Sequence, residues 1–261
     1  KLCKSIVSAI RSVIGKNKNI IGLHEPNISK LEKKFVKKCL DQNFISSKGV
    51  FVQQFERKLQ DITKSKKVIA VISGTAALHL AMRAINLKRN EEVLIPAFNY
   101  IASANSVIYC GGIPHFVDIE KESLGIDVEK LKIYLNKICI IKNGKAVNKK
   151  TNRRIKAIIP MHVFGHPSKI SEIIKIAKDY KLDLIEDAAE ALGSLYKGKH
   201  VGTFGKIGIL SFNGNKTIST GSGGAILTQD IKIANLVKRL AGICKIPHKW
   251  KYDYNEVGYN Y

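Results

Sequence analysis

Acidic residues are scarce in this sequence. Its 261 residues include 21 Asp and Glu against 44 Lys and Arg, which gives a formal net charge of +23. Such an excess points toward a polyanion partner, because clustered cations release counterions from a phosphate backbone. Arginine is scarce as well: 37 of the 44 bases are lysines, whereas base-edge and bidentate phosphate recognition favour arginine. We therefore expect no nucleic-acid partner. The alternative hypothesis is that the chain is a basic nucleic-acid-binding protein.

Closely spaced cysteines and long apolar runs are also missing. The five cysteines lie far apart without a C-x-x-C pair, which argues against a disulfide framework or a zinc site and favours reduced thiols in the cytoplasm. The longest uncharged run, 68–82, contains Ser, Gly, Thr and His and is shorter than the roughly 20 apolar residues of a membrane span. Apolar residues near the start fall at helical spacing around Arg11, which indicates a surface helix and no secretory signal. We expect a soluble chain without a membrane partner.

Short apolar runs alternate with helical patterns through most of the chain. With 6 prolines and 45% hydrophobic residues, the composition is that of a globular protein. The alternation predicts an α/β fold with a mostly parallel or mixed sheet covered by helices on both faces. We divide the chain into an N-terminal helical segment, 1–50, and one large domain, 51–261, in which the very basic stretch 142–156 is expected as an exposed hairpin or loop. The predicted strands are 68–73, 92–96, 113–118, 156–160, 182–187, 208–212 and 224–228, and helices are predicted at 2–14, 29–40, 75–86, 101–109, 168–180 and 230–241.

Three motifs carry candidate chemistry. Small residues at 73–77 follow a strand and open a helix, so they present backbone N–H groups that suit a phosphate, although such residues are more often simple helix caps. Asp187 ends a strand, where it can cap the next turn or keep the ring nitrogen of pyridoxal phosphate protonated. Lys216 precedes a Gly-rich turn in a context poor in charge. It fits either a surface residue or a shielded amine that bonds to a carbonyl.

The combination of these motifs is more specific than each alone. Gly-Thr-Ala-Ala-Leu at 74–78, Tyr100 after a strand-end proline, Glu-Asp-Ala-Ala at 186–189 and Ser211 five residues before Lys216 follow one another along the chain. In this order the sequence resembles the DegT/DnrJ/StrS-type sugar aminotransferases from about Gly22 to Tyr261. These enzymes use pyridoxal phosphate and have fold type I, the aspartate aminotransferase fold.

The resemblance also implies a branch of that family. The segments LHEP, ISSKG, PMHVFGHP, PHKW and GYNY are most similar to enzymes acting on nucleotide-linked 4-keto-6-deoxy-N-acetylhexosamines, the branch associated with legionaminic acid and bacillosamine.

The resemblance implies roles for the matching residues. Lys216 would bond to the cofactor and then move protons, Asp187 would pair with the pyridine nitrogen, and Tyr100 would stack on the ring. The backbone of Gly74, Thr75 and Ala76 and the hydroxyl of Ser211 would hold the phosphate. Asn260 would reach the phosphate of a neighbouring subunit, which implies a homodimer with a shared active site.

Other residues have weaker support from the resemblance. Glu190 stands beside the cofactor position, where many relatives have Gln or His. Ser47, His162 and His248 are candidate substrate contacts, although a packed turn residue explains the histidines equally well. No metal site is expected, because Gly165 and Pro167 disfavour a helix that would bring His162 and His166 together.

The implied activity is transfer of an amino group from an amino acid, glutamate, to a nucleotide-linked 4-keto-6-deoxy sugar in amino-sugar biosynthesis for a surface polysaccharide or glycan. A 3-keto substrate or another nucleotide stays open. Related sugar dehydratases have His in place of Lys216, so the lysine favours transamination. Relatives continue past Tyr261 with a small C-terminal domain, so we expect this domain to be missing here, and an inactive fragment is a further alternative.

Overall fold

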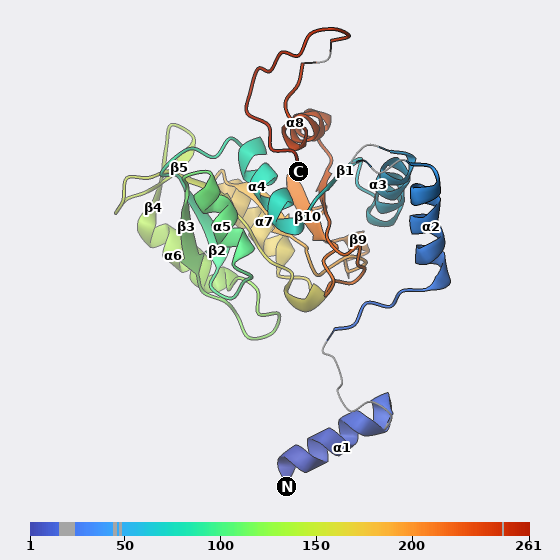
Figure 1. Ribbon diagram of the computed structural model, residues 1–261. Coiled ribbons are helices and arrows are strands. Elements are labelled where there is room, and N and C mark those ends of the chain that lie inside the picture. The colour runs from blue at the N-terminus through green and yellow to red at the C-terminus, as the bar shows by residue number, and fades with distance from the viewer. Residues whose placement is uncertain (16–23, 44–45, 47–48, 247) are drawn as a thin grey trace.

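The alternation of strands and helices organises the fold around one sheet. The computed structural model describes residues 1–15, 24–43, 46, 49–246 and 248–261. Strand β11 (Gly224–Thr228) runs antiparallel to both of its neighbours, and the other adjacent pairs of the sheet are parallel. The prediction of a mostly parallel sheet is therefore confirmed. The seven strands in spatial order are β1 (Lys67–Val71), β11 (Gly224–Thr228), β10 (Ile207–Ser211), β7 (Asp183–Asp187), β6 (Ile155–Ile158), β2 (Glu92–Pro96) and β3 (Ile113–Val117) (Figure 1).

Helices cover both faces of the sheet because successive strand residues point to opposite sides. In β2, Val93 and Ile95 belong to the buried cluster that includes α4, α5 and α8, whereas Leu94 belongs to the cluster of α6 and α7. Leu59 of α3 packs in a third cluster over β1, β10 and β11. The helices are α1 (Leu2–Ile14), α2 (Lys30–Asp41), α3 (Val50–Thr63), α4 (Gly74–Ala84), α5 (Ala102–Tyr109), α6 (Val128–Ile138), α7 (Ile170–Asp179) and α8 (Ile231–Ala241).

The basic stretch 142–156 begins as the expected hairpin. β4 (Cys139–Lys142) and β5 (Lys145–Asn148) pair antiparallel across a tight turn. The hairpin is tied to the buried carboxylate of Glu92, which accepts hydrogen bonds from Asn148 Nδ2 at 3.0 Å and Thr151 Oγ1 at 2.6 Å. A second short hairpin, β8 (Leu195–Tyr196) and β9 (Lys199–His200), follows β7.

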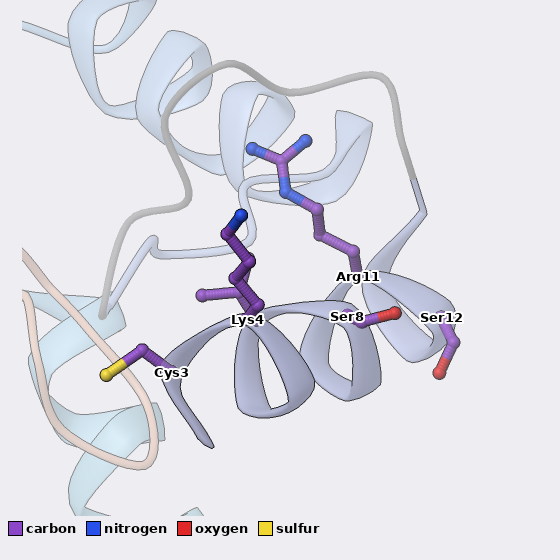
Figure 2. Close-up of a pocket in the computed structure, with 6 residues that line it drawn as sticks. Cys3, Lys4, Ser8, Arg11 and Ser12 are labelled. Atoms are coloured by element: carbon purple, nitrogen blue, oxygen red, sulfur yellow. The ribbon is translucent and has the colours of Figure 1, made fainter. Parts of the chain in front are cut away.

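The predicted N-terminal helix is present as α1. It lies away from the sheet in Figure 1, and none of its residues is buried. Figure 2 shows the hollow along this helix, and the described residues that line it all belong to α1, among them Cys3, Lys4 and Arg11. In the part of the chain that the structure describes, no helix combines the length and apolar character needed to cross a membrane.

The carboxyl ends of β1, β2, β7 and β10 meet at one edge of the sheet. Two close backbone approaches, one at this edge and one near the start of β10, require glycine. A Cβ on Gly224 would lie 2.4 Å from the carbonyl carbon of Ser73, and a Cβ on Gly208 would lie 1.8 Å from the carbonyl oxygen of Gly202. The first approach brings β11 against the turn after β1. The second holds the loop after β9 against β10.

Gly208→Ala should destabilise the fold severely, because the new methyl group meets backbone that has no side-chain freedom to move away. We expect a loss of at least about 3 kcal/mol in the free energy of unfolding, at the upper end of overpacking costs, measured by urea denaturation. Gly214→Ala is the matched control, since a Cβ there meets no atom within 4 Å. Equal stability of the two variants would contradict this prediction.

Candidate active site

A pocket of about 310 Å³ lies at the carboxyl edge of the sheet, the usual ligand position in open α/β sheets. Its walls come from the segments that follow β1, β2, β7 and β10. Most of the sequence-predicted cofactor residues line it, and these are Gly74, Thr75, Tyr100, Asp187, Glu190, Ser211 and Lys216.

Asp187 is the last residue of β7 and is almost fully buried. Ser103 Oγ donates a hydrogen bond to its Oδ2 at 2.8 Å, and the Ala189 N–H donates to its Oδ1 at 3.2 Å. Burial raises the pKa of Asp187, and these hydrogen bonds together with the charge of Lys216 offset only part of that rise. Its position suits a carboxylate that shares a proton with a buried ring nitrogen.

Sequence reasoning missed Ser103. It lies in the first turn of α5, three residues after Tyr100, and only the three-dimensional fold brings its hydroxyl to Asp187 at the end of β7. Its spacing from Tyr100 is the one signal in the sequence that places it near the pocket.

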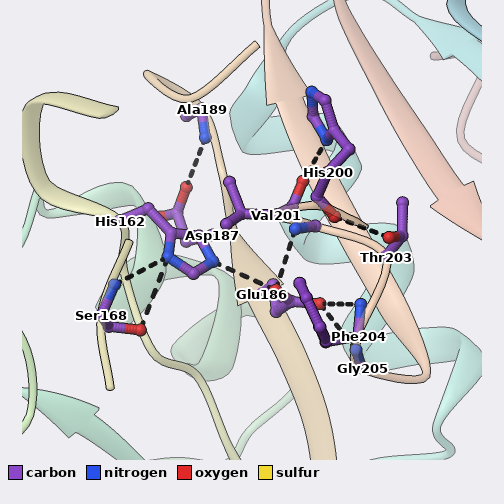
Figure 3. A network of polar contacts seen from close by, with 11 residues as sticks. His162, Ser168, Glu186, Asp187, Ala189, His200, Val201, Thr203, Phe204 and Gly205 are labelled. Carbon is purple, nitrogen blue, oxygen red and sulfur yellow. Dashed lines mark hydrogen bonds and ion pairs between the residues drawn. The ribbon is translucent and has the colours of Figure 1, made fainter. Parts of the chain in front are cut away.

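A buried polar network lies behind Asp187 (Figure 3). Glu186 Oε1 accepts hydrogen bonds from the N–H groups of Phe204 at 2.7 Å and Gly205 at 2.6 Å, and its Oε2 accepts from the Gly202 N–H at 2.8 Å. His162 Nε2 lies 3.1 Å from the same Oε2. The Ser168 N–H donates to His162 Nδ1 at 3.2 Å, so the ring proton sits on Nε2 and is donated to Glu186.

Lys216 lines the pocket. Its Nζ is 3.0 Å from Glu190 Oε1 and 6.0 Å from the centre of the Tyr100 ring, and 13% of its side chain is exposed. Tyr100 itself is 65% exposed. A base, an acid and an accessible aromatic ring therefore surround one shared space.

The turn that opens α4 forms a cradle for an anion. Ser73 Oγ caps the helix by accepting from the Ala76 N–H at 3.0 Å, which leaves the N–H groups of Gly74 and Thr75 as helix-start donors at the pocket wall. A Cβ on Gly74 would lie 2.9 Å from Ser211 Cβ, so only glycine lets the Ser211 hydroxyl approach this turn. Of the predicted phosphate contacts, Ala76 needs correction: its N–H is used by Ser73 and it does not line the pocket.

The three predicted substrate residues have different outcomes. The prediction for His162 is wrong in this structure, because the ring is 0% exposed and serves the Glu186 network. His248 lies outside the pocket in an exposed segment, where its Nδ1 accepts from the N–H groups of Trp250 and Lys251. Ser47 lies outside the described residues.

Asn260 also lies away from this pocket, with an exposed side chain and its N–H bonded to the Gly242 carbonyl at 2.9 Å. Its expected role concerns a second subunit and stays a prediction.

The donor set fits pyridoxal phosphate. Two helix-start N–H groups and a hydroxyl suit its phosphate, a buried carboxylate suits its ring nitrogen, and one lysine amine suits its aldehyde. No described residue that lines the pocket is a second base competing with Lys216 for that role.

Comparison with known proteins supports the same assignment. The model of the DegT/DnrJ/EryC1/StrS aminotransferase family matches residues 26–261. GDP-perosamine synthase of Escherichia coli O157:H7 is 38% identical over 92% of this chain and 62% of its own length. EpsN of Bacillus subtilis, named as a candidate pyridoxal phosphate-dependent aminotransferase, is 34% identical over 92% of this chain and 59% of its own length.

A solved structure confirms the expected fold. Helicobacter pylori PseC, an aminotransferase involved in the biosynthesis of pseudoaminic acid, has a TM-score of 0.80 and 26% identity, with 92% of this chain and 61% of that chain covered. The chain thus spans about three fifths of the length of the curated relatives named above.

Glu186→Gln should destabilise the protein. The amide NH₂ of Gln replaces an oxygen that accepts two hydrogen bonds, so at least one buried donor loses its partner. We expect a loss of about 3 kcal/mol in the free energy of unfolding, measured by urea denaturation. Glu129→Gln, which removes a surface carboxylate paired with Lys132, is the control for charge and should change stability by less than about 1 kcal/mol.

Asp187→Asn should stabilise the cofactor-free protein at neutral pH. Because folding raises the pKa of Asp187 above its ordinary value of 3.8, the ionised carboxylate disfavours the folded state above the folded pKa, and this penalty is lost as pH falls to about 4. We expect a gain in the free energy of unfolding at pH 7 that disappears near pH 4, measured by urea denaturation across that range. A gain independent of pH would show that ionisation of Asp187 is not its cause.

Proposed function

Because this chain belongs to the DegT/DnrJ/EryC1/StrS aminotransferase family, we propose that it is a pyridoxal phosphate-dependent aminotransferase that transfers an amino group from an amino acid to a nucleotide-linked keto sugar. The observation that carries the proposal is that Lys216 and Asp187 lie in one pocket beside the start of α4, with the Asp187 carboxylate accepting two hydrogen bonds. The names of the relatives, which refer to GDP-perosamine and to pseudoaminic acid, support a sugar substrate.

Pyridoxal phosphate, when bound, supplies an electron sink that stabilises negative charge on the carbon next to the transferred nitrogen. Asp187 would hold the proton on its ring nitrogen. The burial that raises the pKa of Asp187 in the free protein also strengthens its attraction to a protonated ring nitrogen. Ser103 fixes the carboxylate from the side of α5, so its orientation does not depend on the ligand.

Lys216 would act twice in the reaction. Its amine would bond to the cofactor aldehyde and would be released when the amino donor takes its place. Once free, it would move a proton between the cofactor carbon and the substrate carbon, the general acid–base role of a positioned amine. Gly74, Thr75 and Ser211 would keep the phosphate still during both steps, and Tyr100 would cover one face of the ring.

We propose a nucleotide-linked 4-keto-6-deoxy sugar as the acceptor, glutamate as the donor, and a product used in surface polysaccharide or glycan. The motifs of the sequence favour an N-acetylhexosamine nucleotide, whereas the names of the first relatives favour a GDP-sugar. A 3-keto acceptor is the second candidate, supported by a UDP-N-acetyl-3-dehydro-glucosamine 3-aminotransferase of Acidithiobacillus ferrooxidans that is 33% identical over 74% of this chain. The net charge of +23 would attract any of these anionic substrates.

The proposed assembly is a homodimer in the cytoplasm. Asn260 and His248 lie outside the pocket of their own chain, which fits a contribution to the site of a second subunit. The five free cysteines fit a reducing compartment.

Lys216→Ala should abolish the reaction. Wild type incubated with pyridoxal phosphate and borohydride should gain the mass of one reduced cofactor on Lys216, and the variant should gain none. The amination assay uses glutamate with UDP- and GDP-linked 4-keto-6-deoxy sugars and detects the product by mass spectrometry. In Lys216→Ala the rate of amination should fall at least about 100-fold, the low end of the contribution of a positioned acid–base group. Lys206→Ala removes a lysine paired with Asp183 outside the pocket and should retain both properties. Undiminished product from Lys216→Ala would overturn the proposal.

A further inference from the structure

Glu190 holds Lys216 in a defined position. Its Oε1 lies 3.0 Å from Lys216 Nζ, and its side chain is 24% exposed against 13% for the lysine. The contact is therefore an ion pair at the pocket wall, partly removed from water, where a charged hydrogen bond is stronger than at an open surface.

The second oxygen of Glu190 is fixed by backbone. Phe164 donates its N–H to Glu190 Oε2 at 3.0 Å. Phe164 has φ 50°, a left-handed conformation that is uncommon for a bulky residue. Gly165, next along the chain, would place a Cβ 3.0 Å from the Glu190 carbonyl oxygen, so the turn packs tightly on Glu190. The carboxylate is thus oriented independently of Lys216.

The two states of Lys216 differ in their need for this carboxylate. When Lys216 Nζ bonds to the cofactor aldehyde, it loses protons, water leaves, and the nitrogen moves into a carbon–nitrogen double bond. When an amino donor displaces it, the donor nitrogen takes over that double bond and Lys216 leaves as an amine. Proton uptake then restores the ammonium that pairs with Glu190. An ion pair available only to the detached lysine favours the detached state.

We infer that Glu190 is a positioning residue that holds Lys216 whenever this side chain is detached from the cofactor, and that it thereby shifts the balance between the two cofactor forms toward pyridoxamine phosphate. This inference rests on the proposed function. The resemblance to the family implied that Glu190 lies beside the cofactor, and the inferred role makes Lys216 its partner.

The test compares the affinities of the cofactor-free protein for the two cofactor forms. Pyridoxal phosphate bonds to Lys216 and breaks the pair with Glu190, whereas pyridoxamine phosphate has no aldehyde and leaves the pair intact. In Glu190→Gln we expect the affinity for pyridoxal phosphate, relative to that for pyridoxamine phosphate, to rise about tenfold, the size of one charged hydrogen bond. Borohydride reduction with mass spectrometry measures the first affinity, and equilibrium dialysis measures the second.

A second measurement uses the loaded full chain. At a fixed ratio of glutamate to 2-oxoglutarate, absorbance gives the ratio of the lysine-bonded form to the pyridoxamine phosphate form. This ratio should increase in Glu190→Gln by the same factor. Glu129→Gln is the matched control, since it removes a carboxylate 2.7 Å from Lys132 Nζ on the surface and should change neither ratio.

An unchanged ratio in Glu190→Gln, with wild type still bonding the cofactor through Lys216, would overturn the role of Glu190 and leave the proposed function intact. Failure of wild type to bond pyridoxal phosphate at all would overturn both.

Discussion

The buried carboxylate of Glu186 is the contact on which the geometry of the pocket depends. It gathers three backbone N–H groups of the 202–205 loop and the ring of His162, so the segments after β6 and after β9 are both tied to the end of β7. Since successive strand residues face opposite sides of a sheet, Glu186 points toward this network and Asp187 toward α5 and the pocket. One residue anchors the strand end, and the next carries the candidate chemistry.

The same arrangement makes Asp187 unfavourable for stability and favourable for function. A carboxylate with few polar neighbours is costly to ionise, and among the described residues only Ser103 and the Ala189 N–H donate hydrogen bonds to it. More hydrogen-bond donors would lower its pKa and stabilise the free protein. They would also compete with a protonated ring nitrogen for the same oxygens. The small number of hydrogen-bond donors around Asp187 is therefore what a cofactor-binding acid needs. Stability must come from other parts of the fold, such as the close backbone packing of Gly208 against Gly202.

The sequence predicted more of the fold than of the contacts within the site. Short apolar runs predicted β7 and β10, and the order of the motifs predicted that Asp187 and Lys216 share one site, because strand ends meet at one edge of a parallel sheet. The buried state of His162 was not predictable, since its partner Glu186 is 24 positions away and a strand-end histidine fits a pocket equally well. The pairing of Glu190 with Lys216 depends on a 26-residue separation and on the turn at Phe164, which no local pattern specifies.

The distribution of charge explains how a lysine-rich chain can keep one lysine for chemistry. Of the described residues that line the pocket, Lys216 is the only base, and Asp187 and Glu190 are the acids. A phosphate bound there would meet the helix-start N–H groups of Gly74 and Thr75, which attract an anion through fixed dipoles. Because these neutral groups can supply the attraction, the site does not need Lys216 as a phosphate contact, and in the structure this lysine pairs with Glu190. The excess of lysine lies outside the pocket, where it acts on an approaching anionic substrate over a longer range.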